Sequence, residues 1–180
     1  MMNLVKSPFK LLRKFLPVTV LFGGWFLLPI YTTVAEPYAP RPVIPADIAE
    51  SYLANAARNS NIPSRSRVGI PVYPGAVVIR TYAVDKRPPK YEGLPIVELI
   101  SADDYQTVIN FYKKQIPDWR NAELLSAYYF AQHGNLNFFK PEEPHVGIHN
   151  MESYYRDGDK EVLRKILPGA KTLIKVFFSK

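Results

Sequence analysis

Two histidines lie four residues apart in "EPHVGIHNM", residues 143–151. If this segment is a strand, alternation places His145 and His149 on the same face, with Gly147 between them. Two imidazoles and a nearby carboxylate can hold zinc, so this pair is the first candidate for a metal site. Pro144 argues against a helix that would bring the two rings together, and the HExxH pattern is absent. We therefore expect no metal and no cofactor, and we name His145 and His149 as the residues to test.

The stretch "SADDYQTVINFYKKQIPDW", residues 101–119, contains the adjacent carboxylates Asp103 and Asp104. Ser101 followed by Asp104 is typical of a helix N-cap, and both carboxylates then lie at the positive end of the helix dipole. One helical face follows, made of Tyr105, Val108, Ile109, Tyr112 and Ile116. Pro117 ends the helix. The stretch therefore predicts a helix that packs in the core rather than a catalytic site.

Other catalytic patterns are absent or incomplete. "DGD" at 157–159 resembles the start of a calcium loop, but Pro168 stands where an EF-hand needs its acidic twelfth residue. No serine lies in a GxSxG motif, and no glycine-rich phosphate loop follows a strand. The chain has no cysteine, which excludes disulfides, thiol nucleophiles and thiolate metal sites. We expect no catalytic residue and no enzymatic activity.

The N-terminal residues 1–35 have the layout of an export signal. Four basic residues lie between positions 6 and 14, and residues 15–35 carry no charge. Small residues near Ala35 suit cleavage by a signal peptidase, whereas an uncleaved stretch of this length could anchor the chain in a membrane. Both alternatives place the remainder outside the cytoplasm, in the periplasm of a bacterium.

Removing the signal changes the charge balance. Of the 23 basic residues 19 follow residue 35, together with all 16 acidic ones, so the exported part carries a formal charge of +3 rather than +7. Such a modest charge gives little support to a nucleic-acid partner, and we expect none.

Residues 36–69 are rich in proline, which predicts a semi-rigid tether between the signal and a domain. Inside it, residues 46–60 have no glycine or proline and predict a short amphipathic helix. Its stripe would comprise Ile48, Tyr52 and Ala56, with Ala49 and Leu53 beside them, and it must cover either its own domain or a partner.

Residues 70–180 predict a globular domain. Strands are expected over 76–84, 94–102, 122–132, 135–139, 143–151 and 170–178, with helices over 101–116 and over 157–167, where Asp159 is the expected cap. This order predicts an α+β fold, with an antiparallel sheet and helices packed mainly on one face. Aromatic doublets such as Tyr128-Tyr129 and Phe177-Phe178 place aromatic rings on both faces of the sheet.

Three segments, "PVYPGAVVIR", "ISADDYQTVINFYKKQIPDW" and "PGAKTLIKVFF", resemble a loose group of exported bacterial proteins of unknown function. The resemblance covers about residues 70–178 and consists of a PGA turn before a strand, a capped helix and a tryptophan after it. It implies a small α+β domain of the cell envelope and carries over no catalytic residue.

These patterns leave three hypotheses. The first is a non-catalytic, exported accessory module that binds an unidentified envelope protein through helix 46–60 and the aromatic sheet face. The second is a periplasmic binder of an apolar small molecule or lipid, held in a cavity between sheet and helix that Tyr105, Tyr112, Tyr128 and Phe130 would line. The third is a metal-dependent hydrolase using the two histidines. The candidate ligand or partner contacts are Tyr52, Tyr105, Tyr112, Tyr128, Phe130 and Phe177.

Overall fold

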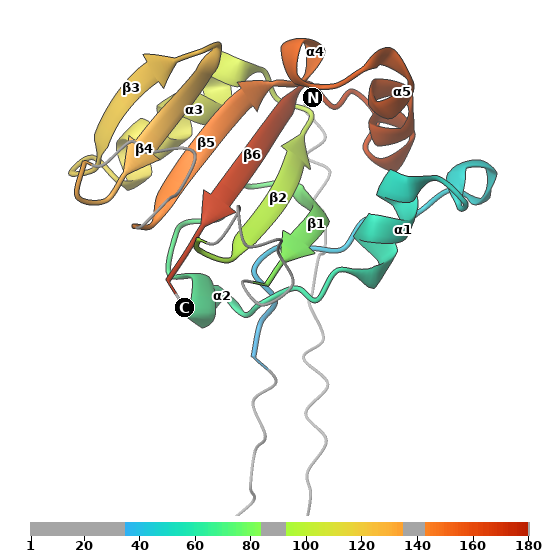
Figure 1. The fold of residues 1–180 in the computed structure, drawn as a ribbon, viewed down its shortest axis with the longest axis horizontal. Coiled ribbons are helices and arrows are strands. Elements are labelled where there is room, and N and C mark those ends of the chain that lie inside the picture. Colours follow the sequence, from blue (N-terminus) through green and yellow to red (C-terminus); the bar gives the residue numbers. More distant parts are fainter. Residues whose placement is uncertain (1–34, 84–92, 135–142, 180) are drawn as a thin grey trace, which may run out of the picture. The chain divides into compact units, whose positions relative to one another are not determined.

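An antiparallel sheet organises the part of the chain that the structure describes (Figure 1). This part comprises residues 35–83, 93–134 and 143–179 of a computed structural model. Its six strands lie in the order β1-β2-β6-β5-β4-β3. They are Val77–Tyr82 (β1), Ile96–Ser101 (β2), Arg120–Leu124 (β3), Ala127–Ala131 (β4), His145–Asn150 (β5) and Thr172–Phe177 (β6). The predicted α+β class with an antiparallel sheet is confirmed.

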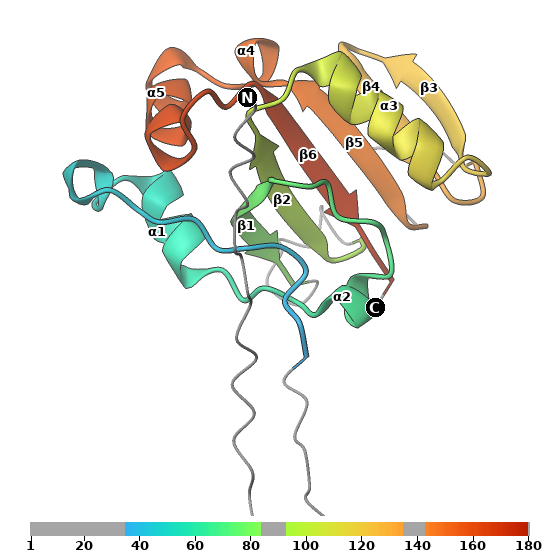
Figure 2. The same cartoon turned by 180° about the vertical axis from the view of Figure 1, so that it is seen from behind.

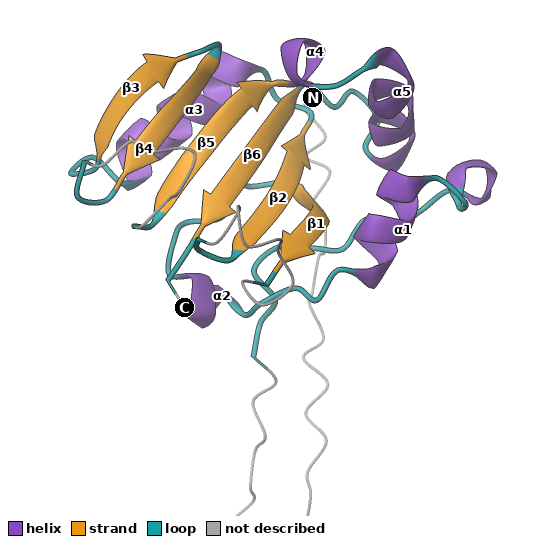
Figure 3. Cartoon of the chain, viewed as in Figure 1, coloured by secondary structure: helices purple, strands orange, loops and turns teal. Residues whose placement is uncertain are grey.

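Helical elements connect and flank these strands (Figure 3). Within the described ranges they are the 3-10 turn Ala46–Ile48 (η1) and the helices Tyr52–Asn59 (α1), Arg65–Val68 (α2), Tyr105–Gln115 (α3), Met151–Tyr154 (α4) and Asp157–Ile166 (α5). The short helices α2 and α4 carry too few residues for a periodic pattern, which is why the sequence did not predict them.

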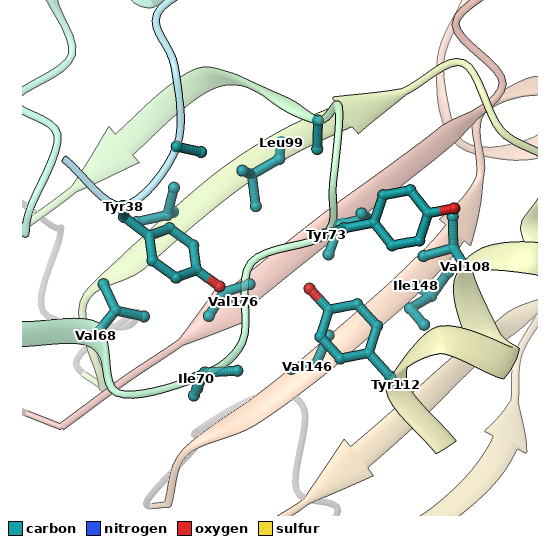
Figure 4. Close-up of a cluster of buried hydrophobic side chains, with 14 of the residues drawn as sticks. Tyr38, Val68, Ile70, Tyr73, Leu99, Val108, Tyr112, Val146, Ile148 and Val176 are labelled. Atoms are coloured by element: carbon teal, nitrogen blue, oxygen red, sulfur yellow. The ribbon is translucent and has the colours of Figure 1, made fainter. Parts of the chain in front are cut away.

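Strand alternation gives the sheet two faces with different neighbours. We call the first the α3 face, because Leu99 and Val176 of the sheet pack there with Val108 and Tyr112 of α3 (Figures 2 and 4). All four side chains are fully buried. Full burial of such a side chain contributes about 1.5–3 kcal/mol, so the α3 face holds much of the fold's stability.

The opposite face, which we call the α5 face, is also covered by helices over part of its area. Ile100 and Leu173 of the sheet cluster there with Leu53 of α1, Met151 of α4 and Leu163 of α5. The expectation that helices pack mainly on one face is therefore wrong. The reason is that α1 and α5 each carry an apolar stripe, and the outward side chains at this end of the sheet are apolar as well.

The proline-rich segment 36–69 belongs to the compact unit Ala35–Lys180 rather than forming a separate tether. Tyr38 and Ala39 are buried in the core of the α3 face. The Tyr38 amide donates to the backbone oxygen of Pro63 at 2.8 Å, and the Val78 amide of β1 donates to that of Pro40 at 3.0 Å. Proline composition predicts an extended backbone, which is correct, but not what that backbone packs against.

The expected helix over 46–60 is divided into η1 and α1. The Ser51 side chain accepts a hydrogen bond from the Ala54 amide and begins α1 at Tyr52. At the other end, Arg41 donates to the backbone oxygens of Ala57, Arg58 and Ser60. The buried side chains of α1 are Leu53, Ala54 and Ala57. The predicted stripe was therefore wrong at Tyr52, whose side chain is 70% exposed.

The helix over 105–115 is confirmed, but its cap differs. Asp104 is the N-cap and accepts from the Thr107 amide at 2.9 Å, while Ser101 ends β2 and accepts from the Asp103 amide. In α5 the N-cap position is Arg156, and the predicted cap Asp159 lies in the first turn. Carboxylates in a first turn still favour the helix through its dipole, so the pattern indicated the helix while missing its first residue.

The single strand expected over 122–132 is instead the hairpin of β3 and β4. Leu125 and Ser126 form its two-residue turn with φ values of 50° and 65°. Turns of this kind normally carry Asn-Gly or Asp-Gly, because L side chains disfavour positive φ. No such pair marks the turn here, so the sequence suggested a continuous strand.

The turn yields a prediction about stability. Replacing Leu125→Asn together with Ser126→Gly is expected to raise the free energy of unfolding by about 1 kcal/mol, because both new residues tolerate positive φ. Leu125 is 88% exposed, so its removal sacrifices little burial. Urea unfolding followed by circular dichroism measures the change. The control Leu124→Asn, at an exposed strand position, should not stabilise; a double variant no more stable than the parent would contradict a strained turn.

Some predictions concern residues outside the described ranges. The signal or anchor over 1–35, except Ala35, and the strand 135–139 lie there and stay predictions. Among the helices of the described ranges, none combines the length and the apolar character needed to cross a bilayer.

Candidate functional site

The two histidines lie on the same face of β5, as the alternation predicted. At roughly 3.3 Å per residue, positions 145 and 149 are about 13 Å apart along the strand, too far to share one metal ion. His145 donates from Nδ1 to the backbone oxygen of Glu143 at 3.1 Å and stacks on Phe177 with ring centroids 3.9 Å apart. His149 contacts Tyr129 and Tyr154 edge-on or tilted, at 5.7 and 4.8 Å. His149 is therefore packed between two aromatic rings, and His145 is packed against one.

Burial keeps both histidines neutral. It lowers the pKa of His145 to about 4, against the opposing hydrogen bond to Glu143, and lowers the pKa of His149 to about 3 with help from the charge of Lys175. In the described part of the chain, no group of three or more His, Asp or Glu side chains is arranged to hold a metal ion. The hydrolase hypothesis thus finds no support in the position of these rings.

Asp103 and Asp104 take part in local structure. The Tyr73 hydroxyl donates to Asp103 Oδ2 at 2.8 Å, and burial together with this carboxylate raises the pKa of Tyr73 to about 12. The hydrogen bond from the Thr107 amide lowers the pKa of Asp104. These contacts agree with the interpretation of the pair as helix-terminal residues.

The aromatic residues proposed as a cavity lining fill the α3 face instead. Tyr112 and Phe130 are fully buried, with ring centroids 6.0 Å apart, and Tyr128 lies 5.3 Å from Phe130. Figure 4 shows the Tyr112 hydroxyl within this core, where burial raises its pKa well above the ordinary value. Tyr105 also packs against the same cluster. A ligand between α3 and the sheet would have to displace these rings, so we correct that part of the apolar-binder hypothesis.

Tyr52 and Phe177 lie elsewhere. Phe177 stacks on His145 on the α5 face, whereas Tyr52 projects from α1 beside β1. Tyr52 lines a cleft of about 560 Å³, a volume usual for small-molecule sites. We call it the α1–β1 cleft; its lining residues are Tyr52, Ala56, Asn59, Ser60, Asn61, Pro63, Arg67, Arg80, Thr81, Tyr82, Ala83, Pro95, Ile96 and Phe178.

A buried charge cluster supports one wall of this cleft. Arg80 of β1, Glu98 of β2 and Lys175 of β6 are opposite one another across three neighbouring strands. Arg80 donates from Nε at 2.8 Å and from Nη2 at 2.6 Å to Oε2 of Glu98, and Lys175 Nζ lies 3.4 Å from Oε1. The Glu98 side chain is only 3% exposed. The two cations therefore hold one buried carboxylate in place.

Aromatic rings complete that wall. The Arg80 guanidinium lies 5.0 Å from the centre of the Tyr82 ring and 6.0 Å from that of Tyr52. Burial, reinforced by the charge of Glu98, raises the pKa of Tyr82 to about 12, so this phenol stays neutral. The cleft thus presents two aromatic rings around a cation that is hydrogen-bonded to Glu98.

No family model, curated protein or solved structure matches this chain. The resemblance to exported bacterial proteins therefore stays a prediction, and the function has to be argued from the residues themselves. The α1–β1 cleft is a concave feature of the described residues that joins cationic, amide and aromatic side chains.

Of the residues lining this cleft, sequence reasoning named only Tyr52 as a candidate ligand or partner contact. Arg80 and Tyr82 could have been paired from strand alternation alone, since they are two residues apart in β1. No sequence pattern indicated that Arg67 would lie near them, because it reaches the cleft from the four-residue helix α2. The cleft combines segments that are far apart in the chain, and local patterns cannot bring them together.

Proposed function

We propose that this chain is a non-catalytic binding module that works outside the cytoplasm and takes a small molecule into the α1–β1 cleft. The observation that carries the proposal is the cleft itself, a volume of about 560 Å³ lined by rings, amides and two arginines. Small-molecule sites are typically concave, largely apolar and equipped with a few converging polar groups. The cleft meets this description.

The absence of catalysis is supported by what the candidate catalytic groups contact. Among the described residues, His145 and His149 are packed neutral rings, Asp104 caps α3, and Asp103 accepts from Tyr73. General acid–base catalysis needs a titratable group within hydrogen-bond reach of a reacting atom. These side chains instead have structural partners of their own.

The location outside the cytoplasm is supported by the export-signal pattern of residues 1–35. Whether residues 15–35 are removed or retained as an anchor is a separate part of the proposal. The polypeptide mass of protein isolated from its own cell envelope distinguishes the two.

The structure changes how a protein partner would have to be tested. Deleting residues 46–60 would remove Ile48, Leu53 and Ala54 from the core of the α5 face and unfold the domain. A single exposed contact is a cleaner probe. Tyr52 is 70% exposed and lines the cleft, so its removal alters the cleft while sparing the core.

We expect native mass spectrometry of the protein, purified gently from its own envelope, to show an adduct of a few hundred daltons. Tyr52→Ala should reduce the bound fraction about tenfold, because losing an aromatic contact commonly weakens binding by more than 1 kcal/mol. The control is Leu125→Ala in the turn between β3 and β4, where the side chain is 88% exposed and outside the cleft; it should retain the adduct. A protein-sized adduct would favour the accessory-module hypothesis instead, and a bare parent protein would count against the proposal.

A further inference from the structure

We propose that the ligand of the α1–β1 cleft is an organic anion, with one carboxylate or phosphate group joined to an apolar body. This inference rests on the proposed function and specifies its ligand class. It follows from the charge of the cleft wall and from the distribution of polar and apolar side chains along it.

The positive charge of the cleft comes from two arginines, of which, among the residues that the structure describes, one is ion-paired and the other is not. Arg80 is ion-paired with Glu98 through two nitrogen atoms, so its guanidinium already has a carboxylate partner within the sheet. Arg67 of α2 is exposed and forms no ion pair with any residue that the structure describes. Among the described residues that line the cleft, none is acidic. Arg67 is therefore the cation that remains to meet a negative group on a ligand.

Neutral polar groups lie around the same cleft. Asn59 is the last residue of α1 and Asn61 lies two residues further on; both line the cleft together with Thr81 of β1. Amides and hydroxyls can donate hydrogen bonds to an oxyanion beside a guanidinium. An uncharged ligand would leave Arg67 partly desolvated without a partner, which is unfavourable.

Most of the remaining lining residues are apolar, and they would contact the apolar body of the ligand. Ile96, Pro95 and Phe178 lie at the end of the β2–β6 pair, and Ala56 and Pro63 face the cleft from the α1 side. Burial of apolar ligand surface contributes about 25 cal/mol per Å². Free inorganic phosphate could use Arg67 but not these side chains, so the apolar body is part of the recognition.

The test measures binding of four probes to the full-length chain freed of copurified small molecules, by isothermal titration calorimetry. The probes are octanoate, octyl phosphate, 1-octanol and inorganic phosphate. Octanoate and octyl phosphate should bind at least tenfold more tightly than 1-octanol, which has the same chain without charge, and more tightly than inorganic phosphate. Arg67→Gln should weaken octanoate binding at least tenfold, to the level of 1-octanol.

The matched control is Arg65→Gln on the same helix, since Arg65 is paired with Glu36 at 3.6 Å and lies outside the cleft lining. It should change octanoate affinity less than twofold. Equal affinities for octanoate and 1-octanol would overturn the inference, and so would an unchanged octanoate affinity in the Arg67→Gln variant. If inorganic phosphate bound as tightly as octyl phosphate does, the proposed role of the ligand's apolar body would be rejected.

A binding experiment with lipid vesicles distinguishes a free amphiphile from a membrane lipid as the natural ligand. If the natural ligand is a free amphiphile, octanoate should bind while vesicles of phosphatidylglycerol show no binding that depends on Arg67. Failure of all four probes and of the vesicles would reject this ligand class. The proposed function would still stand if the native adduct were present and lost in Tyr52→Ala, and it would fail separately if that adduct were absent.

Discussion

Replacing Glu98→Gln is expected to lower the free energy of unfolding by about 3–5 kcal/mol, the range seen when one partner of a buried ion pair is removed. Glu98 is 3% exposed and receives two hydrogen bonds from Arg80, with Lys175 on its other oxygen. Without its charge, two largely buried cations lie next to each other and lose their shared partner. Urea unfolding monitored by circular dichroism measures the loss.

Two companion variants show whether the effect belongs to this cluster. Glu123→Gln makes the same chemical change on the exposed strand β3 and should alter stability by less than about 0.5 kcal/mol. Arg80→Met combined with Glu98→Gln should lose less than the sum of the two single changes, because it removes both charges of one pair. A loss below about 1 kcal/mol for Glu98→Gln would show that the carboxylate is hydrated rather than buried.

The protein is expected to lose stability steeply as the pH falls from about 6.5 to 4. The folded-state pKa values of His145 and His149 lie at about 4 and about 3, below the ordinary value of 6.5. Below pH 6.5 the unfolded chain binds protons that the folded chain excludes, so acid favours unfolding. Each histidine contributes a slope of up to about 1.4 kcal/mol per pH unit, and neither contributes above pH 6.5.

Denaturant unfolding at pH 7, 6 and 5 tests this slope in a window above the ordinary range of carboxyl titration. His149→Gln should reduce the slope by about half, whatever it does to stability at pH 7. His133→Gln, at an exposed position, should leave the slope unchanged. Equal stability at pH 7 and pH 5 in the parent protein would contradict the burial of the two rings.

Both predictions concern the α5 face, which also forms part of the proposed site. Arg80 is held by Glu98 on one side and stacks near Tyr52 and Tyr82 on the other. Loss of Glu98 therefore frees Arg80 as well as destabilising the sheet. We expect Glu98→Gln to alter ligand binding through the position of Arg80 and not through any contact of its own, since Glu98 does not line the cleft.

Several elements follow directly from local sequence. The helix α3 was predictable because Val108, Ile109 and Tyr112 recur at helical spacing and Pro117 prevents continuation. The strand β5 was predictable from the short apolar run around Gly147, including the common face of its two histidines. In both cases the deciding contacts lie within a few residues of chain.

The candidate site was not predictable in the same way. The choice of Tyr105, Tyr112, Tyr128 and Phe130 as cavity residues assumed that aromatic rings beside a helix enclose a space. Their packing against one another depends on where α3 lies on the sheet, and close packing leaves no space there. Only Tyr52 of the early candidates lies in the α1–β1 cleft.

The sequence by itself determined the secondary structure of α3, β2, β5 and β6 and the α+β class, because periodicity and proline position act locally. Tertiary structure alone decided that Tyr38 joins the core, that Leu125-Ser126 turns the chain, and that Arg67 and Arg80 border one cleft. The physical reason is that the burial of Tyr38 and the position of the two arginines depend on contacts between residues distant in the chain, while the hairpin is completed by the pairing of β4 with β5. Burial of apolar surface offsets the conformational entropy lost in forming such contacts only after the whole sheet has formed.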